Sequence, residues 1–202
     1  MNMNFVRAAM AIAALSVANF AAATVYSNSA GSPIEYWGNP NGTEVYGEVF
    51  NTTGGELTNW SFTTTAGNAG NYEFVIADWN GSEATSVVYT SGVTSFAGGA
   101  ENLDFNGINA LLASDSYIAY VSVVGVANAA TDVIFAGSSS NGGLGGQFEF
   151  SNNNPQTAGW STWSNPDMEF SATINHPVPE PASIALVGIA LAALAFARRR
   201  KA

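Results

Sequence analysis

Short apolar segments that alternate with polar residues recur along residues 24–175, and clusters of Gly, Asn, Ser and Thr separate them. The clearest is residues 72–79, where Tyr72, Phe74 and Ile76 would lie on one face of a strand. We find no apolar pattern of period 3.6 long enough for an amphipathic helix in this region. The pattern therefore predicts an all-β body.

The predicted strands follow one another at the spacing that is typical of a β-sandwich. They cover residues 24–27, 34–37, 43–50, 57–64, 72–79, 86–90, 102–105, 117–124, 133–136, 147–150 and 168–174. Turn signals suited to positive φ separate several of them, at Asn41-Gly42, Gly54-Gly55, Asn80-Gly81, Asn106-Gly107 and Asn141-Gly142-Gly143. We expect one helical turn at residues 108–113.

This number of strands predicts two packed antiparallel sheets in one domain over residues 24–176. A jelly-roll-like sandwich is preferred to an immunoglobulin-like one, because the chain has no Cys and therefore no buried Cys pair. A body of this size can be stabilised by burial alone, without disulfides.

The N-terminus has the three parts of a secretory signal peptide. Arg7 precedes a short apolar run at residues 8–18, and small residues at Ala21 and Ala23 fit positions −3 and −1 of a cleavage site. The apolar run is too short to span a membrane, which takes about 20 residues. We therefore expect residues 1–23 to be removed by signal peptidase after export.

The C-terminus, residues 177–202, combines three further features. The triplet Pro179-Glu180-Pro181 comes first, an apolar segment of residues 182–197 follows, and the basic cluster Arg198-Arg199-Arg200-Lys201 comes last. The apolar segment predicts a single transmembrane helix, and the basic cluster would stay in the cytoplasm as a stop, with the body outside.

In these residues the chain resembles the PEP-CTERM sorting signal of exported proteins of Gram-negative bacteria. The resemblance implies that Pro179, Glu180 and Pro181 are recognised by exosortase, a membrane protease that cuts near the triplet. It also implies that residues 182–197 anchor the protein in the membrane at least before processing. The family is typical of bacteria that make exopolysaccharide and biofilm, so the resemblance implies a place in the cell envelope or the extracellular matrix.

The charges divide along the chain in a way that the net value of −10 hides. All five basic residues lie at the ends, in the signal sequence and the C-terminal cluster. The 155 residues from 24 to 178 contain no Lys or Arg and carry 14 of the 15 acids. Because nucleic acid is bound through Lys and Arg, we exclude a nucleic-acid function.

The sequence offers little material for catalysis. The single histidine, His176, is expected in an exposed linker outside the sandwich, so no Ser-His-Asp triad or zinc site can be built around it. The remaining option is a carboxylate glycosidase, with Glu73 and Asp78 or Asp167 and Glu169 as its acid and base. These acids are better explained as strand and turn residues, so we expect no enzyme activity.

Two binding chemistries stay open. Asp78 with Asn80, and Asp104 with Asn106, place oxygen ligands ahead of a Gly, a weak signal for calcium that competes with simple Asx turns. Five tryptophans could stack on sugar rings. Trp60 and Trp79 are expected in the core, whereas Trp160 and Trp163 lie in a polar loop and are the candidate glycan-binding residues.

The leading hypothesis is an exported, non-enzymatic β-sandwich protein that is structural or glycan-adhesive in an exopolysaccharide matrix. The alternative is a lectin-like carbohydrate-binding module. A glycosidase is the third hypothesis. The expected partners are exosortase, signal peptidase and the export machinery, the membrane, and exopolysaccharide.

Overall fold

The computed structural model describes residues 21–29, 31–38, 42–152, 155, 159–163, 166–177 and 188. All twelve elements in this part of the chain are strands. They are β1 (Ala21–Ser27), β2 (Ile34–Trp37), β3 (Val45–Asn68), β4 (Gly70–Trp79), β5 (Ala84–Phe96), β6 (Asn102–Ser122), β7 (Thr131–Phe135), β8 (Gly137–Ser138), β9 (Phe148–Ser151), β10 (Ser161–Trp163), β11 (Asp167–Met168) and β12 (Phe170–Pro177).

The longest feature is an antiparallel ribbon of β3 and β6, which pairs from Val45 opposite Ser122 to Thr63 opposite Asn102. The ribbon folds back on itself near Gly54 and Gly55, whose φ angles are +95° and +141°. Phe50 and Trp60 lie on the two halves of β3, and their ring centroids are 4.9 Å apart. A straight strand would separate these residues by about 33 Å. The bend therefore places the two halves of the ribbon face to face.

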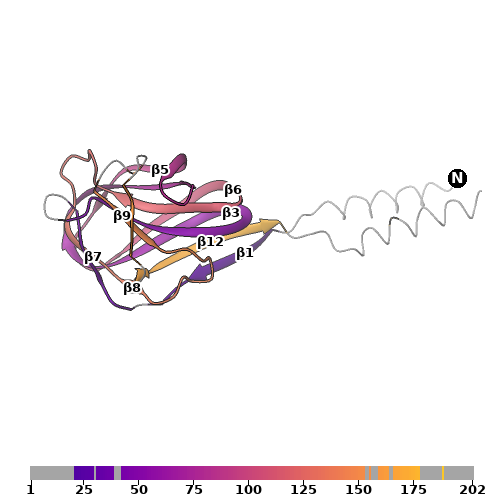
Figure 1. Cartoon of the computed structure of the whole chain (residues 1–202), viewed down its shortest axis with the longest axis horizontal. Coiled ribbons are helices and arrows are strands. Elements are labelled where there is room, and N and C mark those ends of the chain that lie inside the picture. Colours follow the sequence, from indigo (N-terminus) through magenta and orange to yellow (C-terminus); the bar gives the residue numbers. More distant parts are fainter. Residues whose placement is uncertain are drawn as a thin grey trace, which may run out of the picture. The chain divides into compact units, whose positions relative to one another are not determined.

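Two layers result from this bend (Figure 1). One contains β10, β9, the first half of β3, the second half of β6, β4 and β5. The other contains β1, β12, the second half of β3 and the first half of β6, and β7 and β2 pair beyond the end of β3. The structure thus confirms the predicted all-β, antiparallel fold, and its layers are those of a sandwich.

Aromatic side chains fill the space between the layers. Phe74 of β4 stacks on Phe105 of β6 with centroids 3.8 Å apart, and Trp60 of β3 stacks on Phe170 of β12 at 5.0 Å. Such pairs add about 0.5–1.5 kcal/mol each to the gain from burial. Trp60 is fully buried, as the sequence predicts.

Strand β4 is buried on both faces, which goes beyond the predicted alternation. Tyr72, Phe74 and Ile76 join the core between the layers. Val75 and Ala77 join a smaller apolar cluster on the other face of the sheet, together with Trp79 and Tyr120, and Trp160 packs against it. The segment that carries Trp160 therefore covers part of the outer face of this layer.

Two local expectations from the sequence are wrong. Residues 108–113 do not form a helical turn but continue β6, in which Ile108, Ala110 and Leu112 are buried and the residues between them are exposed. The pairs Gly54-Gly55 and Asn106-Gly107 do not close hairpins. The first lies at the bend of the ribbon, and the second lies opposite an irregularity in the β3–β6 register.

Ala23–His176 form one compact unit. Within the described residues, no helix is long and apolar enough to cross a membrane. The predicted signal peptide up to residue 20, the triplet at 179–181, the basic cluster at 198–201 and all of the predicted membrane helix except residue 188 lie outside the described part. The predicted cleavage after Ala23 falls within β1 and would leave Thr24–Ser27 of that strand.

Candidate binding pocket and sorting end

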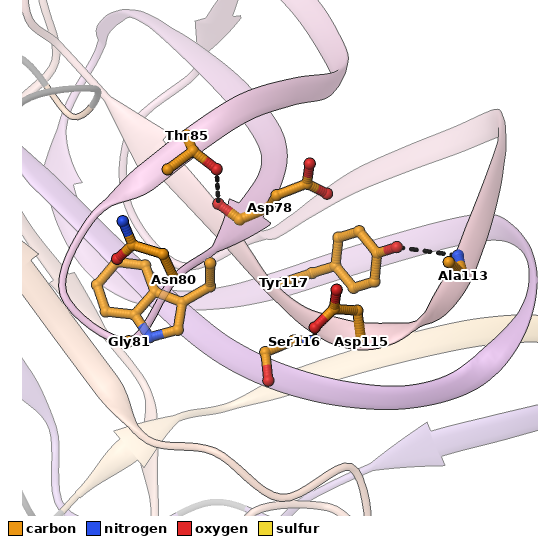
Figure 2. A pocket seen from close by; sticks show the side chains of 9 residues that line it. Asp78, Asn80, Gly81, Thr85, Ala113, Asp115, Ser116 and Tyr117 are labelled. Carbon is orange, nitrogen blue, oxygen red and sulfur yellow. Dashed lines mark hydrogen bonds between the residues drawn. The ribbon is translucent and has the colours of Figure 1, made fainter.

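An open pocket of about 660 Å³ lies at the bent end of the ribbon (Figure 2). One wall is the end of β4 and the turn into β5, and the other wall is the part of β6 that follows the bend. The lining residues are Asp78, Trp79, Asn80, Gly81, Thr85, Ala113, Asp115, Ser116 and Tyr117.

The strand register brings the two walls together. Asp78 of β4 pairs with Tyr117 of β6 at the last position of that ladder. Asp115 pairs with Thr52 of β3, next to the bend at Gly54. The pocket therefore exists because the β3–β6 ribbon turns away from β4 at this point and leaves the end of β4 without a partner strand on its β6 side, while β5 stays paired on the other side.

Hydrogen bonds hold the β6 wall in place. The backbone N–H of Ala113 donates to the Tyr117 hydroxyl oxygen at 2.9 Å. The backbone N–H of Ser116 donates to Oδ1 of Asp115 at 2.8 Å, and the Ser116 hydroxyl donates to Oδ1 of Asn51 at 2.6 Å. These bonds position Tyr117 and Asp115 at the pocket before any ligand arrives.

The electrostatics of the pocket are negative. Burial raises the pKa of the Tyr117 hydroxyl, and the carboxylates of Asp78 and Asp115 raise it further. The hydroxyl therefore stays protonated at neutral pH and can donate a hydrogen bond. The pocket can offer carboxylate acceptors and this one phenolic donor to a ligand.

The four residues predicted for calcium are not brought together. Asp78 and Asn80 line the pocket, but Asn80 Oδ1 already accepts from the backbone N–H groups of Ser82 and Glu83, as in the Asx-turn alternative. Asp104 lies opposite Ser61 in the β3–β6 ladder, and Asn106 Oδ1 accepts from Asn59. Among the described residues, no group of three or more His, Asp or Glu side chains could hold a metal ion.

The two candidate glycan-binding tryptophans have different surroundings. Trp160 is half-buried, with its ring edge-on to Trp79 at 5.6 Å and to Tyr120 at 5.7 Å. Its indole N–H donates to the Pro155 carbonyl at 2.8 Å, so its surroundings are those of a packing residue. Trp163 is 54% exposed on the edge strand β10, with its ring tilted against Phe150 at 6.3 Å, and its exposed part can meet a ligand.

The proposed glycosidase pair Glu73 and Asp78 is not supported by the geometry. The regular β4–β6 ladder places these residues on opposite faces, five positions apart, or about 16 Å along the strand. A glycosidase needs its carboxyl groups roughly 5–10 Å apart. Asp167 and Glu169, the second pair, do not line the pocket described above.

The expectation for His176 is wrong. It belongs to β12, where Nδ1 lies 2.7 Å from the Gly54 carbonyl and Nε2 lies 3.1 Å from the Tyr26 hydroxyl. Because a carbonyl only accepts, Nδ1 carries the proton in the neutral ring, and Tyr26 donates to Nε2. His176 thus ties β1, β3 and β12 together at the bent end. The sequence contains a signal for this position, because the apolar alternation over residues 168–174 predicts a strand that ends only two residues before His176.

Sequence reasoning missed Asp115 and Tyr117 as pocket residues. The apolar pattern places Tyr117 on a strand, and Asp115 lies in the polar segment Ser114-Asp115-Ser116, which carries no ligand signal by itself. Only the pairing of β6 with β4 and the bend of the ribbon bring these residues to Asp78.

Comparison with known proteins identifies the C-terminal segment. Residues 177–201 match the family model described as the PEP-CTERM protein-sorting motif. The motif marks a protein of the cell envelope that is exported and targeted by exosortase. The chain therefore carries a PEP-CTERM sorting motif at this end of its sandwich domain. The motif begins at the last residue of β12, so the folded strand continues directly into it.

The sandwich matches a solved structure described as the cysteine protease and lectin-like domains of Cwp84, a surface layer associated protein of Clostridium difficile. The TM-score is 0.51 and the sequence identity 13%, and the match covers 76% of this chain and 36% of that chain. At this identity the likeness shows the fold alone. The sequence matches no curated protein.

Proposed function

We propose that this protein is a matrix or envelope component whose β-sandwich acts without catalysis, as a structural or glycan-adhesive module, after exosortase cuts the chain near Pro179-Glu180-Pro181. The observation that carries the proposal is the sorting motif at residues 177–201. In the anchored form, residues 182–197 would span the membrane and Arg198 to Lys201 would lie in the cytoplasm. We also propose a jelly-roll-like topology for the sandwich. The bent β3–β6 ribbon supports it, because one long antiparallel pair contributes strands to both layers.

The absence of catalysis is supported by the candidate groups themselves. Both ring nitrogens of His176 are engaged in hydrogen bonds at a strand junction. Glu73 accepts a hydrogen bond of 2.6 Å from Thr90 and lies on the opposite face of β4 from Asp78. Neither arrangement presents an acid and a base to one substrate.

Glycan adhesion is supported by Trp163, whose ring is open to solvent at an edge of the sheet. Aromatic rings in this position stack on the apolar faces of sugars. The likeness to a chain that includes lectin-like domains is in keeping with this role. A lectin-like module with defined sugar specificity is the second candidate.

Sorting is tested by mass spectrometry of the mature protein from a bacterium that has exosortase. We expect a C-terminus near Pro179 and an N-terminus at Thr24. As a control, the triple variant Pro179→Ala, Glu180→Ala, Pro181→Ala should keep Lys201. An intact Lys201 in the unaltered protein would overturn exosortase processing.

Adhesion is tested by binding of the mature protein to the exopolysaccharide of its own host. Trp163→Ala should weaken binding several-fold and leave the protein folded, with only a modest fall in the melting temperature, because the ring is half exposed and packs against Phe150 alone among the aromatic rings of the described residues. Leu111→Ala is a matched control, since Leu111 is 81% exposed on another strand. Equal binding by the two variants would refute the role of Trp163.

A further inference from the structure

The pocket at the bent end has unused hydrogen-bonding capacity. The Asp78 carboxylate makes no hydrogen bond to any described residue, and Asp115 uses only Oδ1. Tyr117 is 4% exposed, and its hydroxyl oxygen accepts from Ala113, but its own proton has no acceptor within the described part of the chain. The Tyr117 hydroxyl borders the pocket, so a ligand there can accept its proton.

The sign of the charge limits the class of ligand. Two carboxylates line the pocket, and no Lys or Arg exists anywhere in residues 24–178 to balance them. A carboxylated, sulfated or phosphorylated ligand would be repelled. A ligand with an ammonium group would supply both the missing positive charge and several donors, and charge-assisted bonds of this kind are the stronger ones.

A bare metal ion fits the pocket less well than an organic cation. Calcium takes six to eight oxygen ligands, whereas Asn80 is committed to its turn and only two carboxylates remain. The volume of about 660 Å³ lies within the range of small-molecule sites. Hydroxyl groups at Thr85 and Ser116 extend the polar lining, and Tyr117 contributes an aromatic ring.

We propose that this pocket binds an amino sugar with a free ammonium group. The ammonium group lies between the carboxylates of Asp78 and Asp115, and the Tyr117 hydroxyl donates to a sugar oxygen. Trp163 does not line this pocket, so the proposal goes beyond the adhesion proposed above. It is tested by variants of the pocket residues and not by variants of Trp163.

Calorimetric titration of the full-length chain in detergent tests this proposal with four sugar probes: glucosamine, N-acetylglucosamine, glucose and glucuronate. We expect glucosamine to bind at least about tenfold more tightly than the acetylated sugar or glucose, and glucuronate not to bind. Binding should weaken with added salt and as the pH rises through the pKa of the sugar's amine. Equal affinity for glucosamine and glucose would overturn the proposal.

Matched variants locate the site. Asp78→Asn and Asp115→Asn should each weaken glucosamine binding about tenfold or more, whereas Asp104→Asn, on the far half of β6, should not. Tyr117→Phe should also weaken glucosamine binding. If this variant unfolds because the Ala113 N–H loses its acceptor, the result for Asp78→Asn alone tests the proposal. Unchanged binding by Asp78→Asn would refute the proposal.

Discussion

Glu48 gives a sharp test of how the core is built, because it is a carboxyl group inside an apolar layer. It is 1% exposed on β3, and its Oε2 accepts a hydrogen bond of 3.0 Å from the backbone N–H of Met168. Its Oε1 has no partner among the described residues. Burial raises the pKa of Glu48 well above the usual 4.5, and the negative charges of Asp167 and Glu149 raise it further.

The sign of the pH dependence follows from this shift. An acid whose pKa is raised on folding binds its proton more tightly in the folded chain, so its contribution to stability is complete below pH 4.5 and is lost as the pH rises toward the folded pKa. Between pH 4.5 and the folded pKa, one such group lowers the free energy of unfolding by about 1.4 kcal/mol for each pH unit of increase. Burial also raises the pKa of Asp167, which acts in the same direction.

Glu48→Gln should remove this component, because the amide keeps an oxygen for Met168 and cannot ionise. Urea unfolding of the protein and the variant from pH 4.5 to pH 8 measures the difference, with the variant gaining stability relative to the unaltered chain as the pH rises. Glu35→Gln, at an exposed position, is the control. Parallel pH profiles for the unaltered chain and Glu48→Gln would refute the reasoning.

Three further predictions concern backbone and contacts. Gly146→Ala should destabilise by about 3 kcal/mol or more in thermal melts, because φ is +104° and the new Cβ would overlap the Val49 carbonyl. Gly81→Ala should cost only about 1 kcal/mol, since φ is +96° but the space is open, and equal losses would contradict the steric argument. His176→Phe should cost about 1–2 kcal/mol and speed proteolysis of β1, and unchanged cleavage would show that its two bonds do not hold that strand.

Much of the fold could be predicted from local patterns. The limits of β2 agree with the predicted segment 34–37, and the segment 72–79 lies within β4. The burial of Trp60 follows from its position on an apolar strand. These features depend on residues close together in the chain, which a pattern of alternating side chains reports directly.

The parts that could not be predicted depend on pairing between distant residues. Gly54-Gly55 has the composition of a hairpin turn, yet β3 continues through it because β6 bends alongside over the same distance. Asp115 reaches Asp78 only through that bend. The polar loop around Trp160 predicts an exposed ring, but Trp79 and Tyr120 provide a surface on which it packs.

The position of β12 has a consequence for the timing of folding. β12 lies between β1 and β3 in the sheet. Trp60 of β3 therefore pairs with Ala172 of β12, a residue that is exported long after it. Sheets that depend on such distant pairings fold slowly. During export the second layer therefore lacks β12 until the residues directly before the sorting motif have been exported. The sandwich cannot be completed before the residues that adjoin the sorting motif have been exported, which places the last step of folding next to the motif in the order of export.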